Sequence, residues 1–200
     1  MSKLVLATGN RSKLAEIMEI VVPLGIKVVP QSEFAVPEVE ESGLSFVENA
    51  ILKARNAARH SGLPALADDS GLEVDALHGA PGIYSARYAG DDRDDQANNR
   101  LLLSRLAGIP AEKRTARFQC VIVFLRRPDD PVPLISHAGW EGRIVEQPRG
   151  ENGFGYDPLF LVGGMRCTSA ELSAAEKNRI SHRGRALAML VRQLPAWMER

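Results

Sequence analysis

The stretch LVLATGNRSKLAEIMEIV (residues 4–21) decides the fold class, because it predicts a strand, a tight turn and a helix in direct succession. Residues 4–8 are a short apolar run, typical of a buried strand. Pro23 then ends the helix. The apolar side chains that recur at helical spacing between turn and proline are Leu14, Ile17, Met18 and Val21. Such an opening unit favours an α/β protein.

Outward from this unit, strands and helices are intermixed. Residues 25–30 and 116–125 predict two more strands, and Ser45 with Glu48 has the capping-box spacing that begins a helix. Residues 64–67 and 72–77 are apolar runs that predict two strands. The acidic pair between these runs is followed by Ser and Gly, which predicts a turn there.

The second half predicts a helix over about residues 95–107 and a pair of strands, 132–138 and 142–147, around a turn. A second capping-box spacing, Ser173 with Glu176, precedes a predicted C-terminal helix. The inward side chains of that helix are Ala186, Leu187, Leu190, Val191 and Leu194. The chain has no internal repeat or linker, so we expect one domain over residues 1–200, an α/β fold on a mixed sheet.

Composition excludes several classes of protein. Of the 200 residues, 44% are apolar and 25% charged, as in soluble globular chains and unlike disordered, collagen-like or coiled-coil sequences. The 25 basic residues balance the 25 acidic ones, so we expect no direct binding of nucleic acid and no attraction to an anionic membrane.

The balanced sum hides an uneven distribution. Residues 31–95 hold 13 acidic and 5 basic residues, whereas residues 166–200 hold 7 basic and 3 acidic ones. On opposite sides of one cleft, these segments would suit a polyphosphate, with carboxylates holding Mg²⁺ and basic side chains holding phosphate oxygens. Two independent solvated faces are the alternative, which composition alone favours.

The sequence also predicts a cytoplasmic location. No apolar run approaches the roughly 18–20 residues that span a bilayer, and the N-terminal run is shorter than a signal-peptide core. The two cysteines, Cys120 and Cys167, lie far apart, which suits a reduced protein and provides no cysteine-based metal site.

Four segments carry candidate chemistry. The turn Thr8 to Lys13 joins a strand to a helix, where free backbone amides favour an anion, although an ordinary turn is the simpler explanation. Asp68 and Asp69 are adjacent, so on a strand at most one of them faces a given metal ion. Asn152–Pro158 places aromatic rings among glycines, which suits a flat base, and Ser181–Gly184 supplies side chains with donor groups.

Together these segments resemble the inosine triphosphate pyrophosphatase family, in its bacterial branch. The matching motifs are Thr8-Gly9-Asn10-x-x-Lys13, Ser45-Phe46-x-Glu48-Asn49-Ala50, Ala67-Asp68-Asp69-Ser70-Gly71-Leu72, Pro81-Gly82-Ile83-Tyr84-Ser85-Ala86-Arg87, Gly153-Phe154-Gly155-Tyr156-Asp157 and Ser181-His182-Arg183-Gly184. The resemblance implies an elongated mixed sheet flanked by helices, with two lobes around a central nucleotide-binding cleft. It also implies a homodimer and Mg²⁺-dependent hydrolysis of XTP, ITP and dITP to the monophosphate and pyrophosphate, with about one Mg²⁺ per subunit. Such an activity keeps deaminated bases out of DNA and RNA.

The resemblance further implies the site residues. Asp69 is the expected proton acceptor and a Mg²⁺ ligand, with Glu41 as the second ligand and Glu40 as the alternative. The expected substrate-binding residues are Thr8, Gly9, Asn10, Arg11, Ser12, Lys13, Ser70, Phe154, Gly155, Tyr156, Asp157, Lys177, His182 and Arg183. Phe154 would stack on the base, and donors from His182 and Arg183 would favour a 6-oxo purine over adenine.

Three other interpretations compete with this one. A nucleotide sensor without turnover would have no need of the water-activating Asp69. A Maf-type pyrophosphatase would act on modified pyrimidine nucleotides, whereas the motifs at Phe154 and at His182 favour purines. A nucleic-acid-binding module lacks support, because the net charge is zero and no RNP, KH or helix-turn-helix motif is present.

Overall fold

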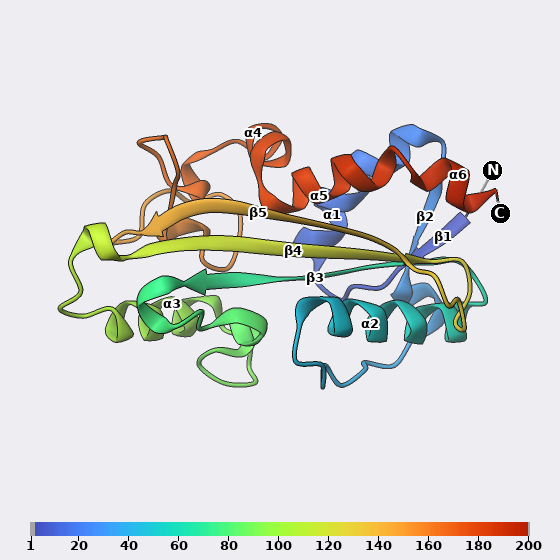
Figure 1. Ribbon diagram of the computed structural model, residues 1–200, viewed down its shortest axis with the longest axis horizontal. Helices are drawn as coiled ribbons and strands as arrows, with labels where there is room; N and C mark the ends of the chain where they lie inside the picture. Colours follow the sequence, from blue (N-terminus) through green and yellow to red (C-terminus); the bar gives the residue numbers. More distant parts are fainter. Residues whose placement is uncertain (1–2, 200) are drawn as a thin grey trace. The chain divides into compact units, whose positions relative to one another are not determined.

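The computed structural model describes residues 3–199 and confirms an α/β fold on a mixed sheet (Figure 1). The strand order is β2-β1-β3-β4-β5-β6. Strand β1 runs parallel to β2 and β3, and β6 is antiparallel to β5. The strands are β1 Lys3–Leu6, β2 Lys27–Pro30, β3 Ala65–Val74, β4 Thr115–Leu125, β5 Leu134–Ile144 and β6 Phe160–Val162.

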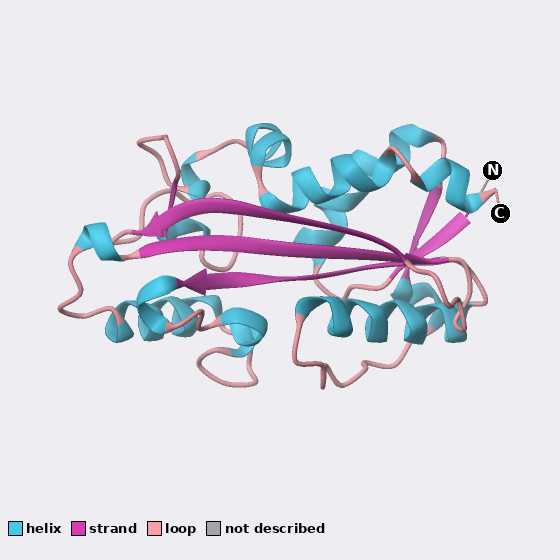
Figure 2. Ribbon diagram, viewed as in Figure 1, coloured by secondary structure: helices cyan, strands magenta, loops and turns pink. Residues whose placement is uncertain are grey.

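Helices and strands are intermixed along the described residues, as the cyan and magenta segments of Figure 2 show. They are α1 Arg11–Val21, α2 Phe46–Ser61, α3 Asp95–Arg105, α4 Ala174–Ile180, α5 His182–Val191 and α6 Leu194–Met198. Several begin at capping side chains, for example Asn10 before α1 and Ser45 before α2. In the part of the chain that the structure describes, no helix is long and apolar enough to cross a membrane.

The chain divides into two compact units. Unit 1 comprises the residues up to Asp69, Cys120–Ala138, and the residues from Arg183 onward. Unit 2 comprises Ser70–Gln119 and Gly139–His182. The three strands β3, β4 and β5 each contribute residues to both units.

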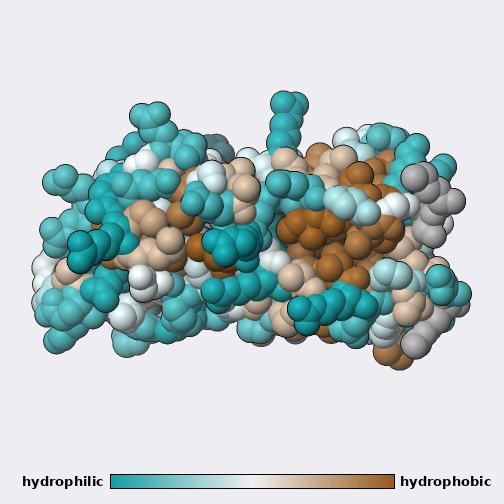
Figure 3. Space-filling view, turned by 90° about the horizontal axis from the view of Figure 1, so that it is seen from above, coloured by the Kyte–Doolittle hydropathy of each residue, from teal (hydrophilic) through white to brown (hydrophobic). Residues whose placement is uncertain are grey.

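Unit 1 has a helical layer on each face of its strands, because alternate strand residues are apolar on both sides. On one face, Leu66 and Ile122 pack with side chains of α1 and α5, such as Ile17 and Leu187. The other face packs against α2, whose buried side chains are small: Ala50, Ala54, Ala57 and Ala58. Figure 3 looks onto the side that carries α5 and shows apolar surface there among hydrophilic side chains.

Unit 2 has a core of its own, rich in aromatic rings. Phe118 of β4 lies 4.6 Å from Phe160 of β6, between ring centroids, and Trp140 of β5 lies 5.2 Å from Phe160. Leu102 and Leu106 join this core from α3 and the residue after it. The candidate residues Phe154–Asp157 belong to the same unit.

The predicted turn at the acidic pair was wrong. Asp68 and Asp69 lie inside the continuous strand β3, and both are buried. Cations contributed by helices pair with both carboxylates, as described below, so the strand tolerates charges that composition alone assigns to a turn.

The predicted strand pair around residues 139–142 was wrong as well. Strand β5 passes straight through this stretch, and Trp140 is 2% exposed. The glycine at 142 has another reason, since a side chain there would collide with the carbonyl oxygen of Leu161 on β6. It marks close pairing of strands and not a turn.

The predicted C-terminal helix is divided into three helices, α4, α5 and α6. The first, α4, has the predicted capping box, with Ser173 as N-cap and Glu176 closing it. The chain becomes extended at Ser181, where φ is −71° and ψ is 166°. A second break separates α5 from α6, so the predicted inward residues are divided between these two helices.

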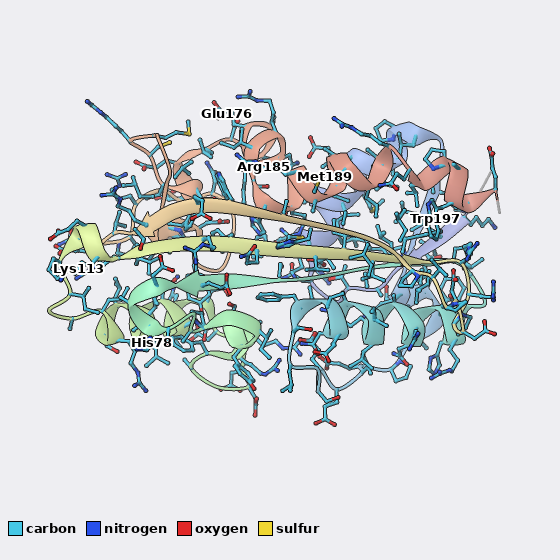
Figure 4. The ribbon with its side chains drawn as sticks, in the orientation of Figure 1. His78, Lys113, Glu176, Arg185, Met189 and Trp197 are labelled. Atoms are coloured by element: carbon cyan, nitrogen blue, oxygen red, sulfur yellow. The ribbon has the colours of Figure 1, made fainter. Side chains whose placement is uncertain are left out.

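The hairpin between β4 and β5 is closed by a buried carboxylate. Asp130 accepts hydrogen bonds from Nε and Nη2 of Arg126, both at 2.7 Å, and from the backbone amides of Arg126 and Val132. The guanidinium carbon of Arg126 also lies 5.2 Å from the ring centroid of Trp197 in α6. Figure 4 labels Trp197 near the C-terminal end of the chain. One side chain therefore links the hairpin to the C-terminal helix.

We expect Asp130→Ala to lower the melting temperature by several degrees, because four donors lose their acceptor. The hydrogen bonds from Arg126, supported by those from backbone amides, hold the pKa of Asp130 well below its usual range. The stabilisation is therefore present at neutral pH and lost as the pH falls below about 4. Asp129→Ala is the control, since that side chain is exposed. Equal melting temperatures for the two variants would contradict this role.

Candidate functional site

The predicted anion-binding turn lies at the start of α1 and is organised by its own side chains. Asn10 caps the helix, accepting at Oδ1 from the amides of Ser12 at 2.9 Å and Lys13 at 3.0 Å. The amide of Asn10 donates to Oγ1 of Thr8 at 3.1 Å. Gly9 has open space around its Cα. Lys13 lies in the first turn of the helix, where the helix dipole adds positive potential.

Asp68 joins three elements of unit 1 through one carboxylate oxygen. Its Oδ2 lies 3.1 Å from Nζ of Lys13 in α1 and 3.2 Å from Nη2 of Arg183 in α5. Nη1 of Arg183 donates to Glu16 of α1. Asp68 and Arg183 are both 2% exposed or less, so this is a buried network of charges.

Asp69 points to the opposite face of β3 and has another partner. Its Oδ1 accepts from Nζ of Lys53 in α2 at 2.7 Å, and the same ammonium lies 3.2 Å from Oε1 of Glu41. The other oxygen of Asp69, Oδ2, is buried and has no hydrogen-bond partner among the described residues. The two adjacent carboxylates thus face different groups, as the alternation of a strand predicts.

The two carboxylates also differ in pKa. Burial would raise the pKa of Asp68, but Lys13 and then Arg183 outweigh it and hold that pKa well below the usual range. Burial raises the pKa of Asp69, and the opposing effect of Lys53 does not fully offset it. Asp68 is therefore a firmly ionised partner of cations, and Asp69 binds a proton more readily than an ordinary aspartate.

The carboxylates of Asp69 and Glu41 are the candidates for holding a divalent cation. Among residues 3–199, no group of three or more His, Cys, Asp and Glu side chains is arranged to hold a metal ion. Mg²⁺ in phosphate-binding sites usually needs only one or two carboxylates, with phosphate and water completing the shell. The unpartnered Oδ2 of Asp69, with Glu41 beside the same ammonium, fits that smaller demand.

A second group of candidate residues lies in unit 2 around Asp157. Its Oδ2 accepts from Nζ of Lys177 at 2.6 Å and from the amide of Phe154 at 2.9 Å, and its Oδ1 accepts from Ser169 at 2.7 Å. The ammonium of Lys177 also lies 4.7 Å from the ring centroid of Phe154. A cation over an aromatic face stabilises the arrangement. The backbone and the ring of Phe154 are thus both held.

The remaining predicted residues differ in their burial and their partners. The imidazole of His182 stacks on Phe118, with ring centroids 4.7 Å apart and planes within 10° of each other. The hydroxyl of Tyr156 donates to the carbonyl of Ser85 at 2.8 Å, which makes Tyr156 a buried support for the loop. Ser70 is half-buried in β3, and Arg11 and Ser12 are exposed at the start of α1.

Sequence analysis missed three side chains of the charge networks. Lys53 bridges Asp69 and Glu41, Glu16 holds Arg183, and Asp68 was given no role of its own. The available signal was the buried acidic pair itself, since buried carboxylates require cations. It could not say which lysine or arginine supplies them.

These features define an α/β protein with a helix N-terminus beside buried carboxylates and cations, a combination suited to a phosphorylated ligand. The Ham1 family model matches residues 4–193, and the chain belongs to this family. The family resemblance predicted from the motifs is thereby confirmed.

Relatives and solved structures agree with this assignment. A dITP/XTP pyrophosphatase of Thioalkalivibrio sulfidiphilus is 60% identical over 192 residues, covering 96% of this chain and 98% of that protein. A dITP/XTP pyrophosphatase of Vibrio parahaemolyticus is 56% identical, with 98% of each chain covered. The structure of a HAM1 protein from Coxiella burnetii matches with a TM-score of 0.91 at 52% identity, covering 98% of this chain and 100% of that one.

The glycine before Phe154 allows a test of the Asp157 cluster. Gly153 has φ of +77°, and a Cβ there would collide with Oδ2 of Asp157. Gly155 has φ of +60° with open space around it. We expect Gly153→Ala to reduce the free energy of unfolding by clearly more than Gly155→Ala, which adds only left-handed strain of about 1 kcal/mol. Urea unfolding of both variants measures the difference, and equal losses would mean that the contact with Asp157 is unimportant.

Proposed function

We propose that this chain is a hydrolase that cleaves nucleoside triphosphates between the α and β phosphates, releasing the monophosphate and pyrophosphate. Its substrates are the deaminated purine nucleotides XTP, ITP and dITP, and the relatives described above are dITP/XTP pyrophosphatases. One observation carries the proposal: Asp69 keeps a buried, unpartnered oxygen while Lys53 holds its other oxygen.

Asp69 acts on the attacking water. Its Oδ2 orients the water and accepts its proton. Lys53 fixes the carboxylate in one orientation through Oδ1. Asp69 and Glu41 would hold Mg²⁺, which when bound supplies positive charge to phosphate oxygens and makes water more acidic.

The start of α1 binds the phosphates. Lys13 supplies an ammonium near the helix N-terminus. The amides of Asn10, Ser12 and Lys13 donate within the turn, so the other polar groups from Thr8 to Ser12 supply the hydrogen bonds to phosphate. Asp68 holds Lys13 in place by an ion pair and is not itself a reacting group. The side chain of Asn10 accepts from two amides of the turn, so it also fixes the shape of the turn.

Phe154 stacks on the purine base, and Lys177 with Asp157 fixes the ring. Selection for a 6-oxo purine requires donors, for which His182 and Arg183 remain the predicted sources. Arg183 also donates to Asp68 and Glu16, which hold its guanidinium in place. The same proposal includes a homodimer, a cytoplasmic location and the removal of deaminated nucleotides.

Product analysis tests the reaction. We expect Mg²⁺-dependent release of pyrophosphate and IMP from ITP, loss of release with EDTA, and much slower turnover of ATP, GTP and dTTP. Initial rates of pyrophosphate and orthophosphate release, with identification of the nucleotide product, measure this. Binding of ITP without turnover would indicate a sensor, and orthophosphate as the first product would place the attack on another phosphate.

Asp69→Asn should abolish nearly all turnover of ITP while the protein stays folded, because the amide cannot accept the proton of water. The measurement is kcat/KM beside a circular dichroism melt. Asp75→Asn is the control, since Asp75 pairs with Arg117 at the surface. An Asp69→Asn activity within about tenfold of the parent, equal to about 1.4 kcal/mol in the barrier, would refute the assignment.

A further inference from the structure

Helix α3 holds the backbone of Gly155 from both sides. The amide of Gly155 donates to Oδ2 of Asp95 at 2.7 Å, and its carbonyl accepts from Nδ2 of Asn99 at 3.0 Å. Asp95 and Asn99 are four residues apart in α3, so they project from one side of the helix. Both polar groups of one loop residue are thus fixed by one helical turn.

The fixed residue directly follows Phe154. Gly155 has φ of +60°, a left-handed conformation, and the amide of Phe154 on its other side is bound by Asp157. Loss of the contacts to α3 would leave the peptide after Phe154 free to rotate, and with it the plane of the aromatic ring. The ring's position therefore depends on α3 as well as on Asp157.

Helix α3 is a suitable rigid support. Asp94 caps its first turn, accepting from the amides of Gln96 and Ala97. Asn98 is 2% exposed, donates to the carbonyl of Ala86 and accepts from the amide of Ala89. The helix is tied to the chain before it, so its side chains can hold the loop without moving with it.

Asn99 is also retained at a cost to stability. Its Oδ1 is buried and has no hydrogen-bond partner among the described residues, although Nδ2 is well bonded. A buried unsatisfied carbonyl costs about 1–3 kcal/mol. The hydrogen bond from Nδ2 to the Gly155 carbonyl offsets part of that cost.

We propose that Asp95 and Asn99 are positioning residues for the base: they hold the Gly155 peptide so that the ring of Phe154 is ready to stack. This inference rests on the proposed function, in which Phe154 stacks on the purine. The clamp, meaning Asp95 and Asn99 together, acts on binding of the base and not on phosphate hydrolysis. It stabilises the ring before substrate arrives, which reduces the ordering cost of binding.

The test separates KM from kcat for ITP in the full chain with Mg²⁺. Asn99→Ala and Asp95→Ala should each raise KM about tenfold, with kcat changed less than about twofold, because binding of the base is weakened and the reacting groups are untouched. Asp95→Asn should restore a KM near that of the parent, since the amide oxygen still accepts from Gly155. Gln96→Ala is the control, since Gln96 is the exposed neighbour of Asp95 in the same helix turn.

Combination with Phe154→Ala decides whether the clamp acts through the ring. Asn99→Ala should add little to the KM of Phe154→Ala, because the ring that it positions is already gone. Additive effects, an unchanged KM for Asn99→Ala, or a fall confined to kcat would each overturn the proposal. If Asn99→Ala does not fold, the Asp95→Ala and Asp95→Asn pair carries the same test in both backgrounds.

Failure of the proposed function gives a different result. Without base stacking, Phe154→Ala would leave the KM for ITP unchanged, and any effect of Asn99→Ala would then not pass through the ring. If Phe154→Ala raises KM while the clamp variants match Gln96→Ala, the stacking role stands and the clamp alone is refuted.

Discussion

The burial of two adjacent carboxylates in the middle of β3 is the constraint on which unit 1 depends. A buried charge without a partner costs several kcal/mol, so each carboxylate requires a cation. Lys13 of α1 and Arg183 of α5 serve Asp68, and Lys53 of α2 serves Asp69. The charges of one strand therefore restrict the placement of three helices, and the apolar packing on both faces acts within that restriction.

The same constraint explains where sequence reasoning succeeded and where it failed. Periodicity predicted α2 and β4 because the apolar side chains of each element leave a repeating pattern that is local in sequence. The acidic pair looked like a turn, since its composition satisfies the local rule and the cations that overrule it lie elsewhere in the chain. Gly142 misled in a similar way, because its cause is the backbone of β6 and not its own neighbours.

In the candidate site, too, some features were predicted from the sequence and others were not. Residue types and motifs predicted Asp69, Lys13, Phe154 and Lys177, and strand alternation predicted that the two aspartates face apart. The pairing of Arg183 with Asp68 spans 115 residues, and that of Asn99 with Gly155 spans 56. No spacing rule reaches such distances. Their only trace in the sequence is a polar residue where the fold has a buried acceptor or donor to satisfy.

Neighbouring aspartates on opposite faces of a strand can take different chemical roles. One oxygen of Asp68 pairs with both Lys13 and Arg183. These cations lower the pKa of Asp68, so the carboxylate stays ionised. Asp69 meets one cation at Oδ1 and keeps Oδ2 unpartnered among the described residues, and burial raises its pKa. The alternation of β3 therefore gives the two carboxylates different cations, Lys13 and Arg183 for Asp68 and Lys53 for Asp69.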